Sequence, residues 1–258
     1  MGIKKHIPNA ITLLNLFCGS IAVIFAVQGQ LELTAIFVML GIFFDFFDGL
    51  AARVLNVQSE LGLQLDSLAD MVTSGVAPGI VMFQLLNRSV SQNDWGADHA
   101  FYSESVGANS GAAFLESFAN PLTLIGLLII LASAYRLAKF NIDTRQTTSF
   151  IGLPTPANTL LIVCLPLILT TAAPEWAINL IHNTWFLIGL TLLSCYLLNA
   201  EIPLFALKFK TWGFGENKLR YIFLITTLIL LVVFKFLAVP FVILLYVLLS
   251  LIFRKQSI

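Results

Sequence analysis

Four aspartates occur as two closely spaced pairs within an otherwise apolar stretch of the chain. Asp45 and Asp48 are three residues apart and Asp66 and Asp70 are four apart, so on helices each pair shares one face. Residues 45–70 contain no histidine or cysteine, so a metal ion bound there would have oxygen ligands. Oxygen ligands suit hard divalent cations such as Mg²⁺ or Mn²⁺, and two such ions about 4 Å apart are a recurrent device for displacement at phosphorus. The spacing therefore predicts a divalent-metal centre suited to chemistry at phosphorus.

The elements that must position these aspartates are apolar. Of the 258 residues, 58% are hydrophobic and 11% are charged, and the mean hydropathy is +0.91. A typical soluble domain is about 25% charged, so this composition excludes a soluble enzyme and a disordered chain. The formal net charge is zero, so the chain has no bulk attraction to polyanions, and we expect no nucleic-acid partner.

We expect an all-α, polytopic integral membrane bundle of about eight transmembrane helices. A crossing helix needs about 20 apolar residues, and a spanning segment must satisfy its own backbone hydrogen bonds, which favours helices. If the last two segments form a re-entrant hairpin, six crossings remain and the sidedness is unchanged. The expected spans are 9–28, 33–53, 66–87, 119–140, 156–173, 184–200, 219–235 and 237–253.

The positions of lysine and arginine predict the orientation of this bundle. With the N-terminus in the cytoplasm and eight crossings, all but Arg88 and Lys235 of the 14 Lys and Arg residues lie on the cytoplasmic side. We therefore expect a multi-pass protein of the inner (cytoplasmic) membrane, with both termini cytoplasmic. The polar, acidic segment 88–118 is expected to be an external loop.

The same orientation places both aspartate pairs near the cytoplasmic ends of neighbouring antiparallel helices, because the connection 54–62 is short. Four unpaired carboxylates would each cost on the order of 2.5–3.5 kcal/mol near the bilayer centre, and Arg53 alone cannot neutralise them. One alternative is a divalent-cation or proton-coupled transporter, which would place its carboxylates near the midplane. A position toward one interface instead favours an enzyme that acts on a lipid headgroup. A non-catalytic scaffold has no reason to bear this cost.

Eight positions between residues 45 and 70 resemble, without a departure, the signature of the CDP-alcohol phosphatidyltransferases: Asp45-x2-Asp48-Gly49-x2-Ala52-Arg53-x8-Gly62-x3-Asp66-x3-Asp70. The resemblance implies one membrane-embedded domain over residues 1–258, built on a six-helix family core with two further helices. It also implies two Mg²⁺ or Mn²⁺ ions per active site, a homodimer, and a catalytic motif at 45–70 that faces the cytoplasm.

The resemblance further implies a role for each matching position. Asp45, Asp48 and Asp66 would bind the metal ions, and Asp70 would be both a ligand and the general base. The positions implied to contact the CDP-diacylglycerol substrate are Asn9, Asp48, Gly49, Arg53, Ser59, Gly62 and Asp66.

Segments outside the motif are similar to the membrane-type phosphatidylserine synthases of bacteria and archaea. They are residues 7–19 (IPNAITLLNLFCG), 135–141 (YRLAKFN, in which relatives often have arginine for Lys139) and 150–157 (FIGLPTPA). This similarity implies transfer of the phosphatidyl group from CDP-diacylglycerol to the hydroxyl of L-serine, giving phosphatidylserine and CMP. Serine carries a carboxylate and needs a cationic donor. The candidate serine-binding residues are Arg136, Lys139 and Asn141.

Several alternatives remain open at this point. The same chemistry with glycerol 3-phosphate or inositol phosphate as acceptor would require a more basic pocket, which the few cations here disfavour only weakly. The transporter also remains, and it predicts ion flux without CMP release. The small-residue pattern 75–79 is compatible with close packing inside the chain or with the homodimer that the resemblance implies.

Overall fold

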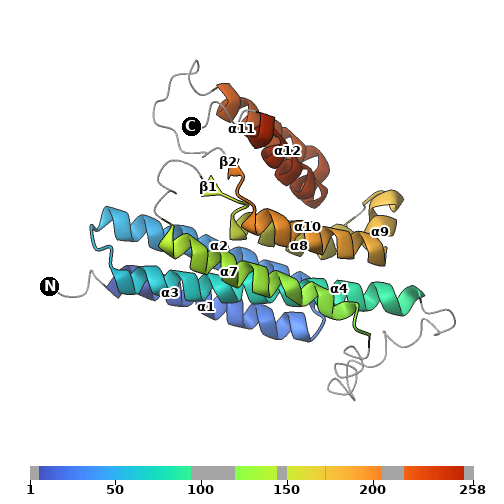
Figure 1. Cartoon of the computed structure of the whole chain (residues 1–258), viewed down its shortest axis with the longest axis horizontal. Coiled ribbons are helices and arrows are strands. Elements are labelled where there is room, and N and C mark those ends of the chain that lie inside the picture. The colour runs from blue at the N-terminus through green and yellow to red at the C-terminus, as the bar shows by residue number, and fades with distance from the viewer. Residues whose placement is uncertain (1–5, 94–119, 144–149, 172, 205–217, 253–258) are drawn as a thin grey trace.

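The regular structure of the described chain is helical, apart from two short strands that pair antiparallel, β1 (Phe150–Ile151) and β2 (Pro203–Leu204). Figure 1 shows long helices lying side by side in one bundle, with a separate pair of helices above it. The predicted all-α class is confirmed. The structure is a computed structural model, and it describes residues 6–93, 120–143, 150–171, 173–204 and 218–252.

The chain begins with a helical hairpin. α1 (His6–Val27) and α2 (Leu31–Val54) pack along each other and are joined by a tight turn. Gly29 in that turn has a φ of 75°, a left-handed conformation that glycine adopts without strain. The hairpin places the end of α2, with its two aspartates, beside the beginning of α1.

A long interrupted helix follows and packs against α1 (Figure 1). It consists of α3 (Glu60–Asp70), a π-helical segment (Met71–Val76) and α4 (Ala77–Asn93). π-helical turns inside α-helices are frequent at functional sites, and this one starts directly after Asp70. Because α4 continues to Asn93, residues 88–93 of the expected external loop are helical. The rest of that loop lies outside the described residues.

The second half of the bundle is built from shorter helices. A 3₁₀ turn (Thr123–Leu127) leads into α7 (Leu128–Ile142). Further along the chain, α9 (Glu175–Ile181) and α10 (Thr184–Asn199) meet at an angle of 72°. α7 contacts the π-helical segment on one side and α10 on the other. It is therefore the element that can bring arginine toward the aspartates. Between α7 and α9 in the chain lies α8 (Thr155–Thr170).

The C-terminal helices α11 (Lys218–Phe234) and α12 (Ala238–Ile252) form a second hairpin. Lys235, in the 3₁₀ turn between them, has a φ of 51°. The rings of Phe223 and Tyr246 lie 5.7 Å apart, so the two helices fold back on each other. This hairpin stands above the bundle in Figure 1 and touches it mainly through α8 and β2.

The expected count of eight crossings is not confirmed. Within the described ranges, five helices are long and apolar enough to cross a membrane, or up to six if the bent pair α9 and α10 is one span. α8 has 16 residues, fewer than the about 20 that a crossing needs. α11 and α12 together make one of the five candidates, Arg220–Ile252, although they fold back as a hairpin. The sequence predicted the turn between the last two segments but not the bend between α9 and α10.

The outer surface is what a multi-pass membrane protein requires. Large apolar side chains on several helices point away from the rest of the chain and leave more than half of their surface exposed. Monomeric soluble proteins rarely expose such continuous apolar surface, whereas lipid tails solvate it. Examples are Phe17, Phe46, Leu131, Trp185 and Val232.

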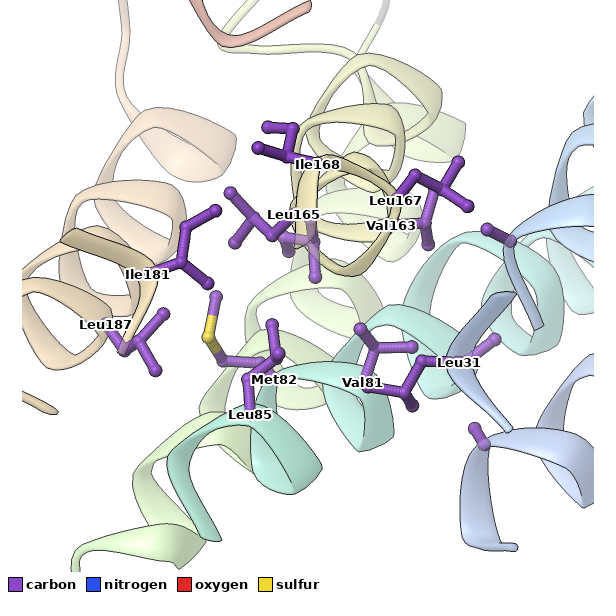
Figure 2. Close-up of a cluster of buried hydrophobic side chains, with 14 of the residues drawn as sticks. Leu31, Val81, Met82, Leu85, Val163, Leu165, Leu167, Ile168, Ile181 and Leu187 are labelled. Atoms are coloured by element: carbon purple, nitrogen blue, oxygen red, sulfur yellow. The ribbon is translucent and has the colours of Figure 1, made fainter. Parts of the chain in front are cut away.

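The best-buried apolar cluster lies at the end of the bundle away from the aspartates. Figure 2 shows it where the first turn of α2 meets α4, α8, α9 and α10, with Leu31, Met82, Leu165 and Leu187 among its members. Asp48 lies almost five turns further along α2, a rise of roughly 25 Å. Val38, the buried cluster member on α2 nearest to Asp48, is ten residues before it, a rise of about 15 Å, so the cluster is centred toward the other end of the same helices.

The small-residue pattern 75–79 is used for packing inside the chain. A Cβ atom at Gly79 would collide with Ile130 of α7, and one at Gly75 would lie 3.3 Å from Cβ of Ser133. These two glycines therefore let α7 approach the π-helical segment and α4 closely. The pattern does not bear on the expected homodimer.

Candidate active site

Three of the predicted aspartates converge. Asp45 and Asp48 on α2 and Asp66 on α3 each bring one carboxylate oxygen within 4.8 Å of the other two. Asp48 is 5% exposed, and its Oδ2 has no hydrogen-bond partner among the described residues. A buried carboxylate oxygen without a partner is costly, and a cation would remove that cost. The donor set is all oxygen, so these residues fit a hard divalent ion.

Asp70 lies beside this cluster rather than within the set of three. It is one turn after Asp66 on the same face of α3, next to the carboxylates of Asp45 and Asp66 and the amide of Asn15. The geometry thus gives three aspartates that can share an ion and a fourth that stands against them. That Asp70 also ligates an ion stays a prediction.

The turn between α2 and α3 sets the direction of Asp66. Asn56 has a φ of 52°, and asparagine is among the residues that tolerate this left-handed conformation. Ser59 then starts α3, because its Oγ accepts a hydrogen bond from the backbone N–H of Gly62 at 3.1 Å. α1 packs against both α2 and α3 and so lies behind the aspartates that the turn brings together.

The positions predicted to bind the nucleotide are also close together. A Cβ atom at Gly62 would lie 3.2 Å from Oγ of Ser59 and 3.3 Å from Oδ1 of Asn9. The missing side chain therefore lets Asn9, on the first helix, reach the start of α3. The observed role of Ser59 is to cap the helix, and its contact with a nucleotide remains a prediction.

Gly49 and Arg53 lie one turn apart on α2, beyond Asp48. A Cβ atom at Gly49 would be 3.7 Å from Nη2 of Arg53, an ordinary van der Waals contact, so this part of the helix backbone is open to a ligand. The Arg53 side chain is exposed. A guanidinium presents a fork of N–H groups that matches phosphate oxygens, which agrees with the predicted contact to a diphosphate.

Two of the three predicted serine-binding residues lie on the side of α7 that faces the aspartates. Arg136 is buried, and its Nη1 donates to Oγ1 of Thr155 at 3.4 Å. It is within electrostatic range of Asp70. Asn141 donates through Nδ2 to Oγ of Ser67 at 2.9 Å, and Ser67 is the neighbour of Asp66.

Lys139 has a different environment. Its Nζ forms an ion pair with Oε1 of Glu201 at 3.4 Å, in a partly exposed position. The pairing leaves its ammonium less available to a substrate than the guanidinium of Arg136, whose Nε has no hydrogen-bond partner in the described part of the chain.

Sequence reasoning missed three polar residues near the site. Asn199 helps to line a small pocket with Arg136 and Lys139. Its Nδ2 donates to two backbone carbonyls, and its Oδ1 has no partner among the described residues. Asn15 and Thr73 are buried behind the aspartates. A polar residue inside an apolar span was a signal for the last two, whereas Asn199 stands at a helix end, where polar residues are ordinary.

Comparison with known protein families identifies the group to which this geometry belongs. The family model of the CDP-alcohol phosphatidyltransferases matches residues 5–197, which include α1, the aspartate cluster and α7. The chain belongs to this family. It is therefore a phosphatidyltransferase of the CDP-alcohol type, and the matched region ends near the C-terminus of α10, before the hairpin of α11 and α12.

Several relatives carry names that refer to serine. The chain is 33% identical over 156 residues to CDP-diacylglycerol–serine O-phosphatidyltransferase of Bacillus subtilis (strain 168), covering 59% of this chain and 70% of that protein. It is 32% identical over 158 residues to the enzyme of the same name from Helicobacter pylori (strain J99), covering 60% of this chain and 55% of that one. An archaetidylserine synthase of Methanothermobacter thermautotrophicus is 28% identical over 153 residues, which cover 58% of this chain and 53% of the relative.

Proposed function

We propose that the protein transfers the phosphatidyl group of CDP-diacylglycerol to the hydroxyl of L-serine, giving phosphatidylserine and CMP. The observation that carries this proposal is the meeting of the aspartates of α2 and α3 with a buried arginine from α7. The aspartates suit a diphosphate substrate with its cations, and Arg136 suits the carboxylate of an amino acid. The names of the relatives agree with serine as the acceptor.

Asp45, Asp48 and Asp66, with Asp70 beside them, would hold two Mg²⁺ or Mn²⁺ ions, which when bound neutralise the diphosphate and the charge that develops on it. Gly49 leaves the backbone of α2 open to the diphosphate. Further contacts to CDP-diacylglycerol are assigned to Asn9, Arg53, Ser59 and Gly62, with Asp48 and Asp66 close to the same diphosphate.

Asp70 acts as the general base. It takes the proton from the serine hydroxyl, and the serine oxygen forms a bond to the β-phosphorus, the one that carries the diacylglycerol. The bond from that phosphorus to the bridging oxygen breaks, and CMP leaves with the electron pair. The proton then passes from Asp70 to water or to CMP. A carboxylate is a weak base for an alcohol. Most of the rate enhancement therefore comes from holding the serine oxygen in line with the phosphorus and the leaving oxygen.

Arg136 binds the serine carboxylate, and Asn141 and Lys139 lie on the same end of α7. Burial favours Arg136 for this role, because a charge-assisted hydrogen bond is stronger away from water. Lys139 would have to leave Glu201 to take part, so we assign it the smaller contribution.

We place the enzyme in the inner (cytoplasmic) membrane, with the aspartates facing the cytoplasm and both termini on that side. CDP-diacylglycerol then enters laterally from the inner leaflet and keeps its acyl chains in lipid. We further propose that residues 1–258 act as one domain and that the enzyme is a homodimer, as the family resemblance implies.

The test is CMP release by the purified protein with CDP-diacylglycerol and Mn²⁺ or Mg²⁺. Serine, glycerol 3-phosphate and inositol phosphate are offered separately. Asp70→Asn removes the base, and Glu60→Gln is the matched control, since Glu60 is an exposed carboxylate at the other end of α3. We expect release with serine alone, lost in Asp70→Asn and kept in Glu60→Gln.

Other outcomes would redirect the proposal. Release with another acceptor would keep the phosphatidyltransferase chemistry and replace serine. Activity of Asp70→Asn at the wild-type rate would remove the base assignment. If folded protein released no CMP with any acceptor, ion flux in sealed vesicles would be measured next, because the transporter predicts flux without a CDP-lipid.

A further inference from the structure

Two fully buried polar side chains, Asn15 on α1 and Thr73 in the π-helical segment, lie behind the aspartates. The hydroxyl of Thr73 is 2.8 Å from Oδ1 of Asn15, to which it donates, and 3.3 Å from the backbone oxygen of Asn15. Because Oδ1 accepts the Thr73 proton, the amide nitrogen Nδ2 must point in the other direction. The hydroxyl of Thr73 therefore decides which end of the Asn15 amide faces the aspartates.

The nitrogen of that amide meets carboxylates from two helices. Nδ2 of Asn15 donates to Oδ1 of Asp45, on α2, at 3.4 Å. The same amide lies beside the carboxylate of Asp70, at the end of α3. An amide nitrogen has two N–H donors, so it can serve both carboxylates. Asn15 thus links the cluster of three aspartates with the fourth.

Two glycines leave the space that this arrangement needs. A Cβ atom at Gly19 would collide with Oγ1 of Thr73, and one at Gly41 would lie 2.7 Å from Cγ2 of Thr73 and 3.0 Å from Oδ1 of Asn15. Gly19 is one turn after Asn15 on α1, and Gly41 is one turn before Asp45 on α2. The two helices and the π-helical segment therefore pack tightly around the Asn15–Thr73 pair, one turn from Asp45.

Packing alone does not account for polar residues at this place. Two buried apolar side chains of similar size would pack equally well and would have no hydrogen bonds to satisfy. Groups that hydrogen-bond to metal ligands from behind fix the orientation of those ligands, and changing such groups commonly costs 10- to 100-fold in metal affinity.

We propose that Asn15 and Thr73 are positioning residues of the metal centre. The Thr73 hydroxyl fixes the Asn15 amide, and the amide holds the carboxylate of Asp45 in the orientation that it shares with Asp48 and Asp66. This inference rests on the metal centre of the proposed function and is independent of the identity of the acceptor.

The test measures Mn²⁺ binding to the purified full-length protein without lipid substrate, by the electron paramagnetic resonance signal of free Mn²⁺. Thr73→Val and Thr73→Ala both lose the hydroxyl but differ in bulk. Thr73→Ser keeps the hydroxyl and loses the methyl group. Asn15→Leu removes the amide at similar size. Size-exclusion profiles and melting temperatures show whether each variant is folded.

We expect Thr73→Val and Thr73→Ala to raise the dissociation constant for Mn²⁺ by about tenfold, and Thr73→Ser to bind as the wild type does. Asn15→Leu should weaken binding at least as much. Because Thr73 acts through Asn15, adding Thr73→Val to Asn15→Leu should cause no further loss. In CMP release, Thr73→Val should need more Mn²⁺ for half-maximal rate and recover most of its kcat at saturating Mn²⁺.

Three results would overturn the inference. Wild-type Mn²⁺ affinity in both Thr73→Val and Thr73→Ala would show that the hydroxyl has no role in the centre. Equal losses in Thr73→Ser and Thr73→Ala would assign the effect to packing. Failure of the wild type itself to bind Mn²⁺ would remove the metal centre together with its positioning residues. CMP release with an acceptor other than serine would affect only the proposed function.

Discussion

Asp48 illustrates the electrostatic cost of placing several carboxylates close together in this site. It is buried, it has an oxygen without a partner in the described chain, and two further carboxylates stand within 4.8 Å of its own. Negative groups at this distance repel one another in a medium of low dielectric constant. The cluster is therefore unfavourable for the protein without cations and becomes favourable when cations are bound.

The substitution Asp48→Asn should have opposite effects on the stability of the protein without Mn²⁺ and with Mn²⁺. Without metal, Asp48→Asn removes one of the repelling charges, so we expect a melting temperature equal to or above that of the wild type. With Mn²⁺ at about 100 times its dissociation constant, the wild type should gain about 2.7 kcal/mol from binding, and the variant much less. Thermal melts with EDTA and with Mn²⁺ measure both values.

Glu60→Gln is the control for this pair of melts, because it also removes one carboxylate from the same region but at an exposed position. It should shift both melting temperatures little and equally. If Asp48→Asn were less stable than the wild type in EDTA, the view of the cluster as electrostatically unfavourable without metal would be wrong.

Arg136→Ala should raise the KM for serine by about tenfold or more, the loss typical of a hydrogen bond to a charged group, and should leave the KM for CDP-diacylglycerol nearly unchanged. Lys139→Ala should have a smaller effect, because Lys139 is already paired with Glu201. Steady-state CMP release with each substrate varied in turn measures both constants. An unchanged KM for serine in Arg136→Ala would remove the arginine from the acceptor site.

The residues of this site differ in how far the sequence could predict them. The four aspartates could be predicted from spacing, because charged groups in an apolar span are costly and are retained mainly where function requires them. Arg136 could be predicted only through family resemblance. Asn15 and Thr73 form their contact across 58 positions of the chain, and no local pattern encodes a contact of that range.

At the scale of elements, the site depends on how closely α1, α2 and the π-helical segment approach. Continuous apolar runs predicted the helices themselves, and the first four expected spans coincide over most of their length with helical segments of the structure. They did not predict the π-helical segment or the 72° bend between α9 and α10, whereas the expected segment 156–173 was already the weakest of the eight because it is short and contains Pro166. The π-helical segment and the bend depend on packing and on individual backbone angles, to which an average over 20 residues is insensitive.

Glycine substitutions test the close approach of these elements. Gly41→Ala places a methyl group 2.7 Å from Cγ2 of Thr73, and Gly19→Ala places one against the Thr73 hydroxyl. We expect each to lower the stability of the protein by about 1–3 kcal/mol, the usual cost of overpacking, and to weaken Mn²⁺ binding. Thermal melts and Mn²⁺ titrations measure the two effects.

Gly189→Ala on α10 is the matched control, because no atom of the described residues lies within 4 Å of the position of its Cβ atom. It should be neutral or slightly stabilising, since alanine is the better helix former. Equal behaviour of Gly41→Ala and Gly189→Ala would mean that α1 and α2 are not held as closely as the structure shows.

At the scale of the whole molecule, all four aspartates lie near the turn between α2 and α3, whereas the turn between α1 and α2 lies at the other end of the bundle. The long α2 separates these two turns by the thickness of a bilayer core, about 30 Å. The proposed orientation places the turn between α2 and α3 on the cytoplasmic side and the turn between α1 and α2 on the outer side, so the two turns can be tested as a pair.

Gln28 and Gln58 are the probes for this test, because both are exposed glutamines in these turns. In a variant without the native cysteines, Gln58→Cys should react with an impermeant maleimide only in inverted inner-membrane vesicles. Gln28→Cys should react only in right-side-out vesicles. The reverse pattern would place the aspartates on the outer side and would contradict the cytoplasmic access of the substrates.

The separation of the apolar cluster in Figure 2 from the aspartates has a consequence for how such an enzyme can change. Leu187 of this cluster and Asn199 of the pocket proposed for the acceptor are twelve residues apart on α10, a rise of roughly 18 Å. Energetic effects at such distances are largely additive. If this pocket holds the acceptor, as proposed, substitutions around Arg136 and Asn199 can change the acceptor without disturbing the packing of that cluster. We expect this arrangement to make the acceptor site tolerant of mutation, and thus a good starting point for directed evolution toward other alcohols.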